Sequence, residues 1–179
     1  MEFYKNYMEE FSKKIADIQI DQFSKSVDMI KHCNNNNGKV IVVGNGGSAS
    51  ISSHVAVDFT KACGLRSVNF NEPNLLTCFA NDYGYENWVS EALKAYSDPN
   101  DLVILISSSG KSQNMLNAAD YCIETGLKLI TFSGFSSKNC LKSKGLINFW
   151  VDSNSYNFVE MAHHLWLVSI VDYFSLKAK

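Results

Sequence analysis

The fold is decided by the stretch KVIVVGNGGSAS, which occupies residues 39–50. Its first half is a run of mostly apolar, β-branched residues, and its second half is a loop of glycine, serine and other small residues. Because glycine accepts backbone conformations that other residues resist, such a loop lets backbone N–H groups approach an anion closely. The stretch therefore predicts a buried strand that leads through a phosphate-binding turn into a helix.

A second stretch of the same design, DLVILISSSGKSQN, occupies residues 101–114. Its hydroxyl groups are concentrated where a following helix would direct its unpaired N–H groups and the positive end of its dipole. One such loop is a weak signal, since serine is a favoured N-cap and Gly/Ser turns after strands are common. Two such loops at one edge of a sheet favour a phosphate site over a pair of ordinary turns.

The rest of the sequence alternates between helical and strand-like patterns. Apolar residues at spacings of three and four predict two helices before residue 34, and the segment 34–38 ends them. Further helices are expected at residues 50–62, 85–96, 114–124 and 157–176, and strands at 39–44, 66–70, 102–106, 127–132 and 146–151. This order predicts an α/β fold with a mainly parallel sheet covered on both faces, in a single domain over residues 1–179.

Composition argues against several classes of protein. No apolar run in the 179 residues reaches membrane-spanning length, and the charged N-terminus lacks a secretory segment, so a cytoplasmic protein without a membrane partner is expected. A net charge of -2 with interspersed signs gives no basic footprint, so nucleic acid is not an expected partner. The five cysteines are widely spread without a C-x-x-C pair, which favours reduced thiols over disulfides.

Four features together carry a resemblance to a known family. They are the loop GNGGS at 44–48, a histidine six residues beyond its serine, the segment FANDYGYEN at 79–87, and the loop SSSGKS at 107–112. In this combination the chain resembles sugar isomerase (SIS) domains, and more narrowly their phosphoheptose isomerase branch. The resemblance implies a flavodoxin-like αβα sandwich with N-terminal helices, and a homotetramer with sites near subunit boundaries. It also implies interconversion of sedoheptulose 7-phosphate and D-glycero-D-manno-heptose 7-phosphate in bacterial heptose biosynthesis (lipopolysaccharide, capsule or S-layer), without a nucleotide cofactor.

The resemblance also assigns the substrate-binding residues. Three serines of the second loop match the family's phosphate-binding positions, and two residues of the first loop match its sugar-contacting positions: Ser107, Ser109 and Ser112, then Asn45 and Ser48. Neighbouring members of the same motifs complete the expected substrate-binding set: Gly46, Gly47, Ser108, Asn81 and Asp82. The phosphate would anchor the substrate and so position its reacting carbons.

A histidine and a carboxylate follow the first loop on one face of the expected helix. His54 and Asp58 are four residues apart, the spacing of an acid/base or metal-binding pair, although an exposed surface contact has the same spacing. The family has His and Glu at the matching positions, both associated with zinc, with the Glu proposed as the catalytic base. Asp58 is one methylene shorter than that Glu.

The last helix supplies a second group, Glu160, His163 and His164. The family has Gln at Glu160 and His at His163, and its later catalytic histidine falls at Val168, one turn beyond His164. The expected catalytic residues are therefore His54, Asp58, Glu160, His163 and His164. The expected zinc ligands are His54, Asp58, Glu160 and His164, since imidazole and carboxylate suit zinc.

Two functions stay open from the sequence. The first is an aldose–ketose isomerase that acts on a sugar phosphate, with Asp58 or Glu160 as base and a histidine as acid. The second is a non-catalytic, phosphosugar-binding SIS protein, such as a DnaA-binding replication initiation regulator, a branch that also lacks the late histidine. In either case the N-terminal segment 1–37 and the apolar last helix have more apolar surface than one small sheet covers, which predicts a homotetramer or, failing that, a dimer.

Overall fold

The computed structural model describes residues 1–177 of the chain. Its centre is one five-stranded sheet with the order β2-β1-β3-β4-β5, in which every paired strand is parallel. The strands are β1 (Val40–Gly44), β2 (Ser67–Asn69), β3 (Leu102–Ser107), β4 (Lys128–Ser133) and β5 (Ile147–Trp150). The predicted α/β fold with a parallel sheet is therefore confirmed.

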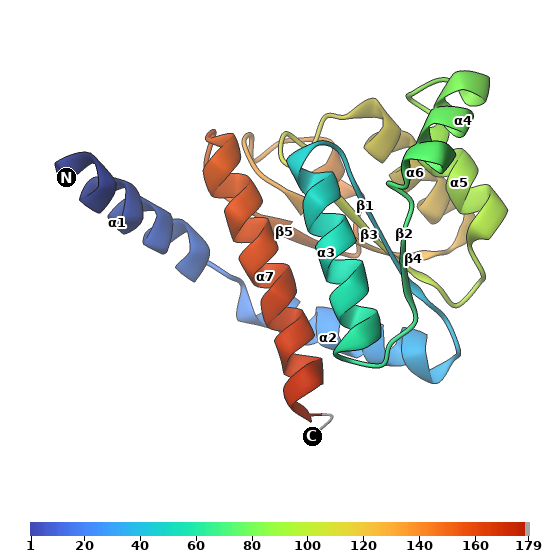
Figure 1. The fold of residues 1–179 in the computed structure, drawn as a ribbon, viewed down its shortest axis with the longest axis horizontal. Helices are drawn as coiled ribbons and strands as arrows, with labels where there is room; N and C mark the ends of the chain where they lie inside the picture. Colours follow the sequence, from blue (N-terminus) through green and yellow to red (C-terminus); the bar gives the residue numbers. More distant parts are fainter. Residues whose placement is uncertain (178–179) are drawn as a thin grey trace.

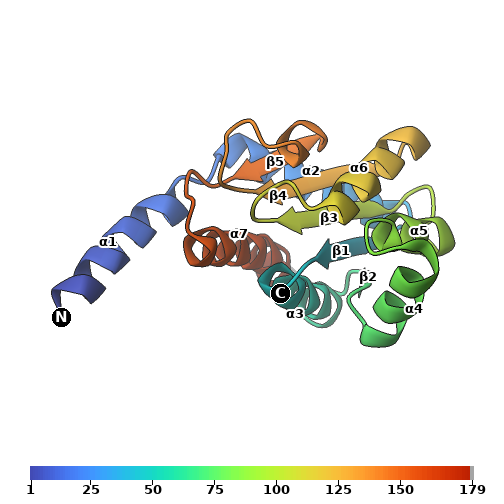
Figure 2. The same cartoon turned by 90° about the horizontal axis from the view of Figure 1, so that it is seen from above.

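Helices cover the sheet on both faces, and the first helix projects away from it (Figures 1 and 2). They are α1 (Glu2–Ala16), α2 (Ile20–Asn35), α3 (Gly47–Lys61), α4 (Pro73–Tyr83), α5 (Trp88–Tyr96), α6 (Gln113–Thr125) and α7 (Tyr156–Lys177), with a short 3-10 helix at Leu141–Ser143. Buried residues of α2, α3 and α7 form one core with the sheet, and those of α5 and α6 form a second core on its other face. No helix among residues 1–177 is long and apolar enough to cross a membrane.

The strand sequences explain the two cores. Along β1, Val40 and Val42 pack into the first core, whereas Ile41 and Val43 pack into the second. Side chains of a strand alternate between the faces of a sheet, so a strand that is apolar throughout is buried on both. All residues of β1 and of β3 are buried.

The register of the central strands brings the two small-residue loops together. In the pair β1 and β3, Val40 lies opposite Leu102 and Gly44 lies opposite Ile106. Both loops therefore leave adjacent strands at the same edge. The connections from β1 and β3 lead to opposite sides in the strand order, which is the point where open α/β sheets bind ligands.

Three helices differ from the prediction. No helix is predicted at residues 73–83, where the structure has α4; Pro73 begins this helix, and the carboxylate of Glu72 caps it by accepting a 2.9 Å hydrogen bond from the N–H of Leu75. Helix α5 begins at Trp88 instead of residue 85. The third difference is that α3 begins at Gly47 instead of residue 50, so the first loop runs directly into its first turn.

Candidate active site

A pocket of about 250 Å³ lies at the carboxyl ends of β1 and β3. Both predicted loops line it, together with the start of α7: Asn45, Gly46, Gly47, Ser48, Ile106, Ser107, Ser108, Ser109, Ser112, Tyr156 and Glu160. A larger hollow of about 500 Å³ lies beside α4 and is lined mainly by apolar side chains, and none of the predicted site residues lines it. The polar lining of the smaller pocket therefore favours it as the site.

The serine loop, residues 107–112, presents hydroxyl groups to this pocket. Ser107 donates to Ser112 over 3.2 Å between their Oγ atoms, and the N–H of Lys111 donates to Ser109 Oγ over 3.3 Å. The Oγ of Ser108 is buried and has no hydrogen-bond partner within residues 1–177. A buried hydroxyl without a partner is costly, and a ligand oxygen in the pocket would satisfy it.

The connection between β4 and β5 donates backbone hydrogen bonds to the serine loop. The N–H of Gly134 donates to the carbonyl of Ser108 over 2.8 Å, and the N–H of Leu141 donates to the carbonyl of Gly110 over 3.1 Å. Gly110 has φ of +62°, and a Cβ there would lie 2.0 Å from Oδ1 of the buried Asn139. Asn139 in turn donates to the Gly134 carbonyl over 3.1 Å. Sequence reasoning missed Asn139, because it is distant from both motifs along the chain.

The pocket has one carboxylate in its lining, that of Glu160. This side chain packs directly against the start of α3, since a Cβ at Gly47 would lie 2.2 Å from Glu160 Oε2. A side chain at position 47 would therefore displace the Glu160 carboxylate. Tyr156 also lines the pocket, although it is not among the residues expected from the sequence. The available signal is its spacing of four residues from Glu160, which puts both side chains on one face of the helix.

His54, Asp58 and His164 form a hydrogen-bonded chain where α3 and α7 lie side by side (Figures 1 and 2). His54 Nδ1 lies 2.8 Å from His164 Nε2, and His54 Nε2 lies 3.1 Å from Asp58 Oδ2. Partial burial lowers the pKa of His164, and the neighbouring His54 lowers it further, while Asp58 acts in the opposite direction. These three residues do not line the pocket.

His163 lies in the core instead of the pocket lining. Its Nε2 lies 3.0 Å from the carbonyl of Ser133, and its ring packs edge-on against Phe132 with the ring centres 5.6 Å apart. Burial lowers the pKa of His163 to about 4, against the smaller opposing effect of the Ser133 carbonyl. His163 is therefore neutral at physiological pH and connects α7 to the end of β4.

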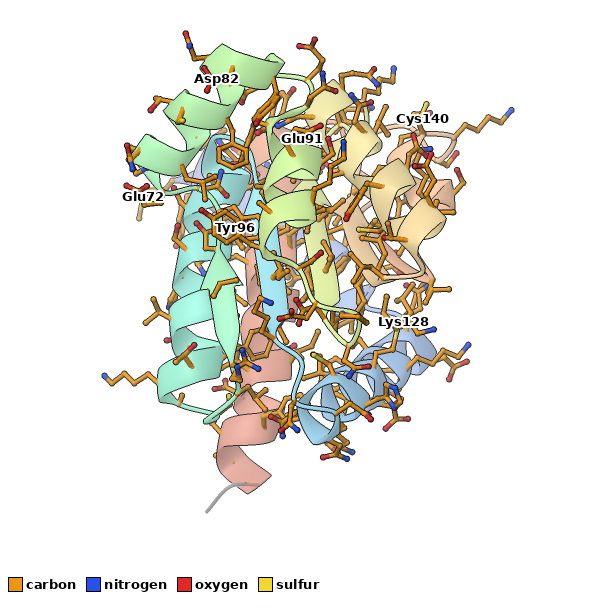
Figure 3. All side chains as sticks on the ribbon, turned by 90° about the vertical axis from the view of Figure 1, so that its right-hand side faces the viewer. Glu72, Asp82, Glu91, Tyr96, Lys128 and Cys140 are labelled. Carbon is orange, nitrogen blue, oxygen red and sulfur yellow. The ribbon has the colours of Figure 1, made fainter. Side chains whose placement is uncertain are left out.

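Asn81 and Asp82 lie at the end of α4, outside the pocket lining. Both are exposed, and Asn81 Nδ2 donates to Asp82 Oδ1 over 2.9 Å. Figure 3 shows Asp82 toward one end of the molecule, with Lys128, the first residue of β4, toward the other. Asp82 thus lies at the carboxyl end of the sheet, as the pocket does, but apart from it.

The expected zinc ligands do not fit a metal ion in this arrangement. Both ring nitrogens of His54 are engaged, one by Asp58 and the other by His164, while Glu160 packs against Gly47 in the pocket. Among residues 1–177, no three or more His, Cys, Asp or Glu side chains are grouped so that they could hold a metal ion.

Comparison with known proteins identifies the family. The SIS domain family matches residues 3–134. The chain is 32% identical to a phosphoheptose isomerase of Helicobacter pylori (strain P12) over 134 residues, which cover 72% of this chain and 69% of that protein.

Two solved structures agree in fold. Phosphoheptose isomerase GmhA from Neisseria gonorrhoeae has a TM-score of 0.86 at 23% identity, with 97% of each chain covered. A phosphoheptose isomerase from Francisella tularensis has a TM-score of 0.86 at 21% identity, covering 98% of this chain and 97% of that one. The chain belongs to the SIS domain family and, by its sequence, to the phosphoheptose isomerase branch of that family.

Proposed function

We propose that this protein is an aldose–ketose isomerase that converts sedoheptulose 7-phosphate into D-glycero-D-manno-heptose 7-phosphate in bacterial heptose biosynthesis. The observation that carries the proposal is the presence of Glu160 in the same pocket as the two small-residue loops. A phosphate anchor and a base that face one cavity are two of the requirements for moving a proton between neighbouring sugar carbons.

The loops hold the phosphate in this proposal. The hydroxyl groups of Ser108, Ser109 and Ser112 donate to its oxygens, and that of Ser107 joins them by turning away from Ser112. The start of α3 adds backbone N–H groups and the positive end of its dipole. Ser108 contributes most clearly, because its buried hydroxyl otherwise lacks a partner among the described residues.

Glu160 is the base in this proposal. Its carboxylate removes a proton from the carbon beside the substrate carbonyl, and the electron pair of that C–H bond becomes the C=C bond of an enediolate. The carbonyl π electrons move to oxygen, which takes up the negative charge. The proton then returns to the former carbonyl carbon, and the neighbouring hydroxyl loses its proton as the new carbonyl forms.

The chain of His164, His54 and Asp58 lies outside the pocket lining, and in this proposal it supplies and takes up the hydroxyl protons from the side of α7 that carries Glu160. His164 follows Glu160 by four residues on α7, so the two side chains share a face of that helix. His163 has a positioning role in this proposal, since its core contacts fix α7 on the sheet. The contacts expected from Asn81 and Asp82 stay predictions.

Zinc on His54, Asp58, Glu160 and His164 is what the family resemblance implies, but the arrangement of these side chains in the described part of the chain does not fit it, and no step above depends on it. Elemental analysis of the purified protein tests it. We further propose a cytoplasmic homotetramer without a nucleic-acid or membrane partner, assembled through the segment 1–37. Exposed apolar residues of α1, among them Tyr4 and Met8, support this assembly.

The second candidate function is that of a non-catalytic phosphosugar-binding regulator. It is favoured by the residue Val168, at the position where the family resemblance places the late histidine of the phosphoheptose isomerases. An assay of the purified protein with sedoheptulose 7-phosphate, with and without added zinc, separates the two. Isomerisation supports the enzyme; binding of C7 and C5 ketose phosphates without any isomerisation rejects the enzyme and leaves the regulator.

A further inference from the structure

The side chain of Asn45 is held by two other segments of the chain. Its Nδ2 donates to Asn114 Oδ1 over 2.9 Å, and Asn114 Nδ2 donates back to Asn45 Oδ1 over 2.9 Å. Tyr85 Oη donates to the same Asn45 Oδ1 over 3.2 Å. Asn114 is buried in the first turn of α6, while Tyr85 follows α4, so three separate segments meet at one amide.

A count of donors and acceptors gives this amide a fixed role. An asparagine oxygen accepts two hydrogen bonds, and its nitrogen donates two. The Oδ1 of Asn45 is saturated by Asn114 and Tyr85, whereas its Nδ2 uses one of its two N–H groups. Because Asn45 lines the pocket, the group it has left for a ligand is an N–H donor.

The buried partner opposes a turn of the Asn45 amide by itself. If the Asn45 amide alone turned over, its oxygen would face Asn114 Oδ1 and its nitrogen would face Asn114 Nδ2. Both hydrogen bonds would be lost, and Asn114 is only 2% exposed, so water cannot readily replace them.

We propose that Asn114, assisted by Tyr85, is a positioning residue that fixes the Asn45 amide with its remaining N–H toward the substrate. That N–H donates to the substrate oxygen that becomes negatively charged as the enediolate forms. The inference rests on the proposed isomerase function and adds an oxyanion donor to it. Such a donor stabilises the transition state more than the ground state, so it acts on kcat more than on substrate binding.

The variant Asn114→Asp tests the positioning role. The carboxylate that this change introduces still accepts from Asn45 Nδ2 but cannot donate to Asn45 Oδ1. We expect kcat to fall by about tenfold or more, since a small displacement of a catalytic group is costly. KM should stay within about twofold, because the serine loop still holds the phosphate. Affinity for inorganic phosphate and for a sugar-alcohol phosphate, which lacks the carbonyl, should be unchanged by calorimetry.

Two further variants keep the test independent of folding. Asn45→Asp retains acceptors for Asn114 Nδ2 and Tyr85, but it removes both the pocket N–H and the N–H that donates to Asn114 Oδ1, and it should lower kcat by about a hundredfold or more. Tyr85→Phe removes one exposed phenol and should lower kcat by about two- to fivefold. Tyr83→Phe is its matched control, because this phenol belongs to the same segment, is 52% exposed like Tyr85 and is not bonded to Asn45; it should leave kcat unchanged.

The outcomes separate this inference from the proposed function. An active wild type with unchanged kcat in Asn45→Asp, or in both Asn114→Asp and Tyr85→Phe, overturns the inference alone. If Asn114→Asp loses phosphate affinity and kcat together, the role of Asn114 is merely structural, and this result also overturns the inference. If Asn114→Asp fails to fold by circular dichroism, Tyr85→Phe against Tyr83→Phe decides. A wild type that isomerises no ketose phosphate rejects the proposed function and the inference with it.

Discussion

The Nδ1 atom of His54 and the Nε2 atom of His164 are 2.8 Å apart, and the two rings are nearly perpendicular at 83°. The Asp58 carboxylate, 3.1 Å from His54 Nε2, accepts a hydrogen bond from the N–H of that nitrogen. In neutral His54 the other ring nitrogen is then an acceptor, and His164 donates to it. Two charged rings at this separation would repel, which agrees with the lowered pKa of His164.

Breaking this chain should abolish proton transfer without releasing the phosphate. We expect Asp58→Asn and His54→Ala each to lower kcat by at least about a hundredfold, the size of effect for a lost general acid or base. Phosphate affinity, measured by calorimetry, should persist. Asp172→Asn is the matched control, since Asp172 is an exposed carboxylate farther along α7. Equal activity of Asp58→Asn and Asp172→Asn would remove the chain from the mechanism.

Ser108→Ala should separate ligand binding from stability. The buried Ser108 hydroxyl has no partner within the described chain, so its removal should leave the free energy of unfolding unchanged or raise it. Affinity for a sugar phosphate should fall by about tenfold, since hydrogen bonds to charged groups are strong.

Ser90→Ala is the control for that variant. Ser90 is 6% exposed, as Ser108 is, but its hydroxyl donates to the Asn87 carbonyl over 2.8 Å. It should lower the free energy of unfolding by about 1 kcal/mol and leave affinity unchanged. Urea denaturation and calorimetry on both variants supply the comparison, and unaltered affinity in Ser108→Ala would mean that phosphate binds elsewhere.

The sequence predicts the sheet and both loops because their signals are local. A strand buried on both faces is apolar throughout, and a glycine or serine loop follows it directly in each case. The partners of these loops are not predictable in the same way. Asn114 and Asn139 are ordinary polar residues until the fold brings them to Asn45 and Gly110.

The sequence pattern of α7 does not predict what its polar side chains contact. Spacings of three and four put Glu160, His163 and His164 on one broad side of a helix, yet adjacent residues differ by about 100° around its axis. Packing alone decides that His163 meets the sheet while His164 meets α3. The sequence therefore identifies the histidines but not their different surroundings.

Gly47→Ala should disturb catalysis more than folding. The added Cβ would lie 2.2 Å from Glu160 Oε2, so this flexible carboxylate must move. Because alanine is the better helix former, we expect an unchanged or higher Tm. We expect kcat to fall by about tenfold or more, as the displaced base loses its alignment. Glu160→Gln, which keeps the shape but removes the base, should lower kcat by at least about a hundredfold. Normal turnover in Glu160→Gln would exclude Glu160 as the base.

Helix α1 should mediate assembly. It projects from the body of the molecule (Figures 1 and 2), and none of its residues is buried. Tyr4 and Met8 are exposed one turn apart, while Tyr7 packs on Phe158 of α7. The double variant Tyr4→Asp/Met8→Asp should convert a tetramer into smaller species by light scattering at micromolar concentration. Lys5→Asp changes the net charge equally and should leave the assembly intact. A monomeric wild type would contradict the prediction.

His163 should make the protein less stable in acid. Its pKa is lowered to about 4 in the folded protein, while the unfolded chain has the ordinary value near 6.5. Above pH 6.5 both states are neutral, so the full stability is present. As the pH falls, the unfolded chain binds a proton that the folded protein does not, and stability is lost until the pH reaches about 4. The loss amounts to about 3 kcal/mol. The variant His163→Gln does not have this pH-dependent loss. Its free energy of unfolding, measured by urea denaturation, is expected to be lower than that of the wild type at about pH 7, and this difference should shrink by that amount at about pH 4. His32→Gln, at an exposed position on α2, should keep the wild-type pH dependence. A constant difference in the free energy of unfolding between wild type and His163→Gln over this range would mean that His163 binds a proton as readily in the folded protein as in the unfolded chain.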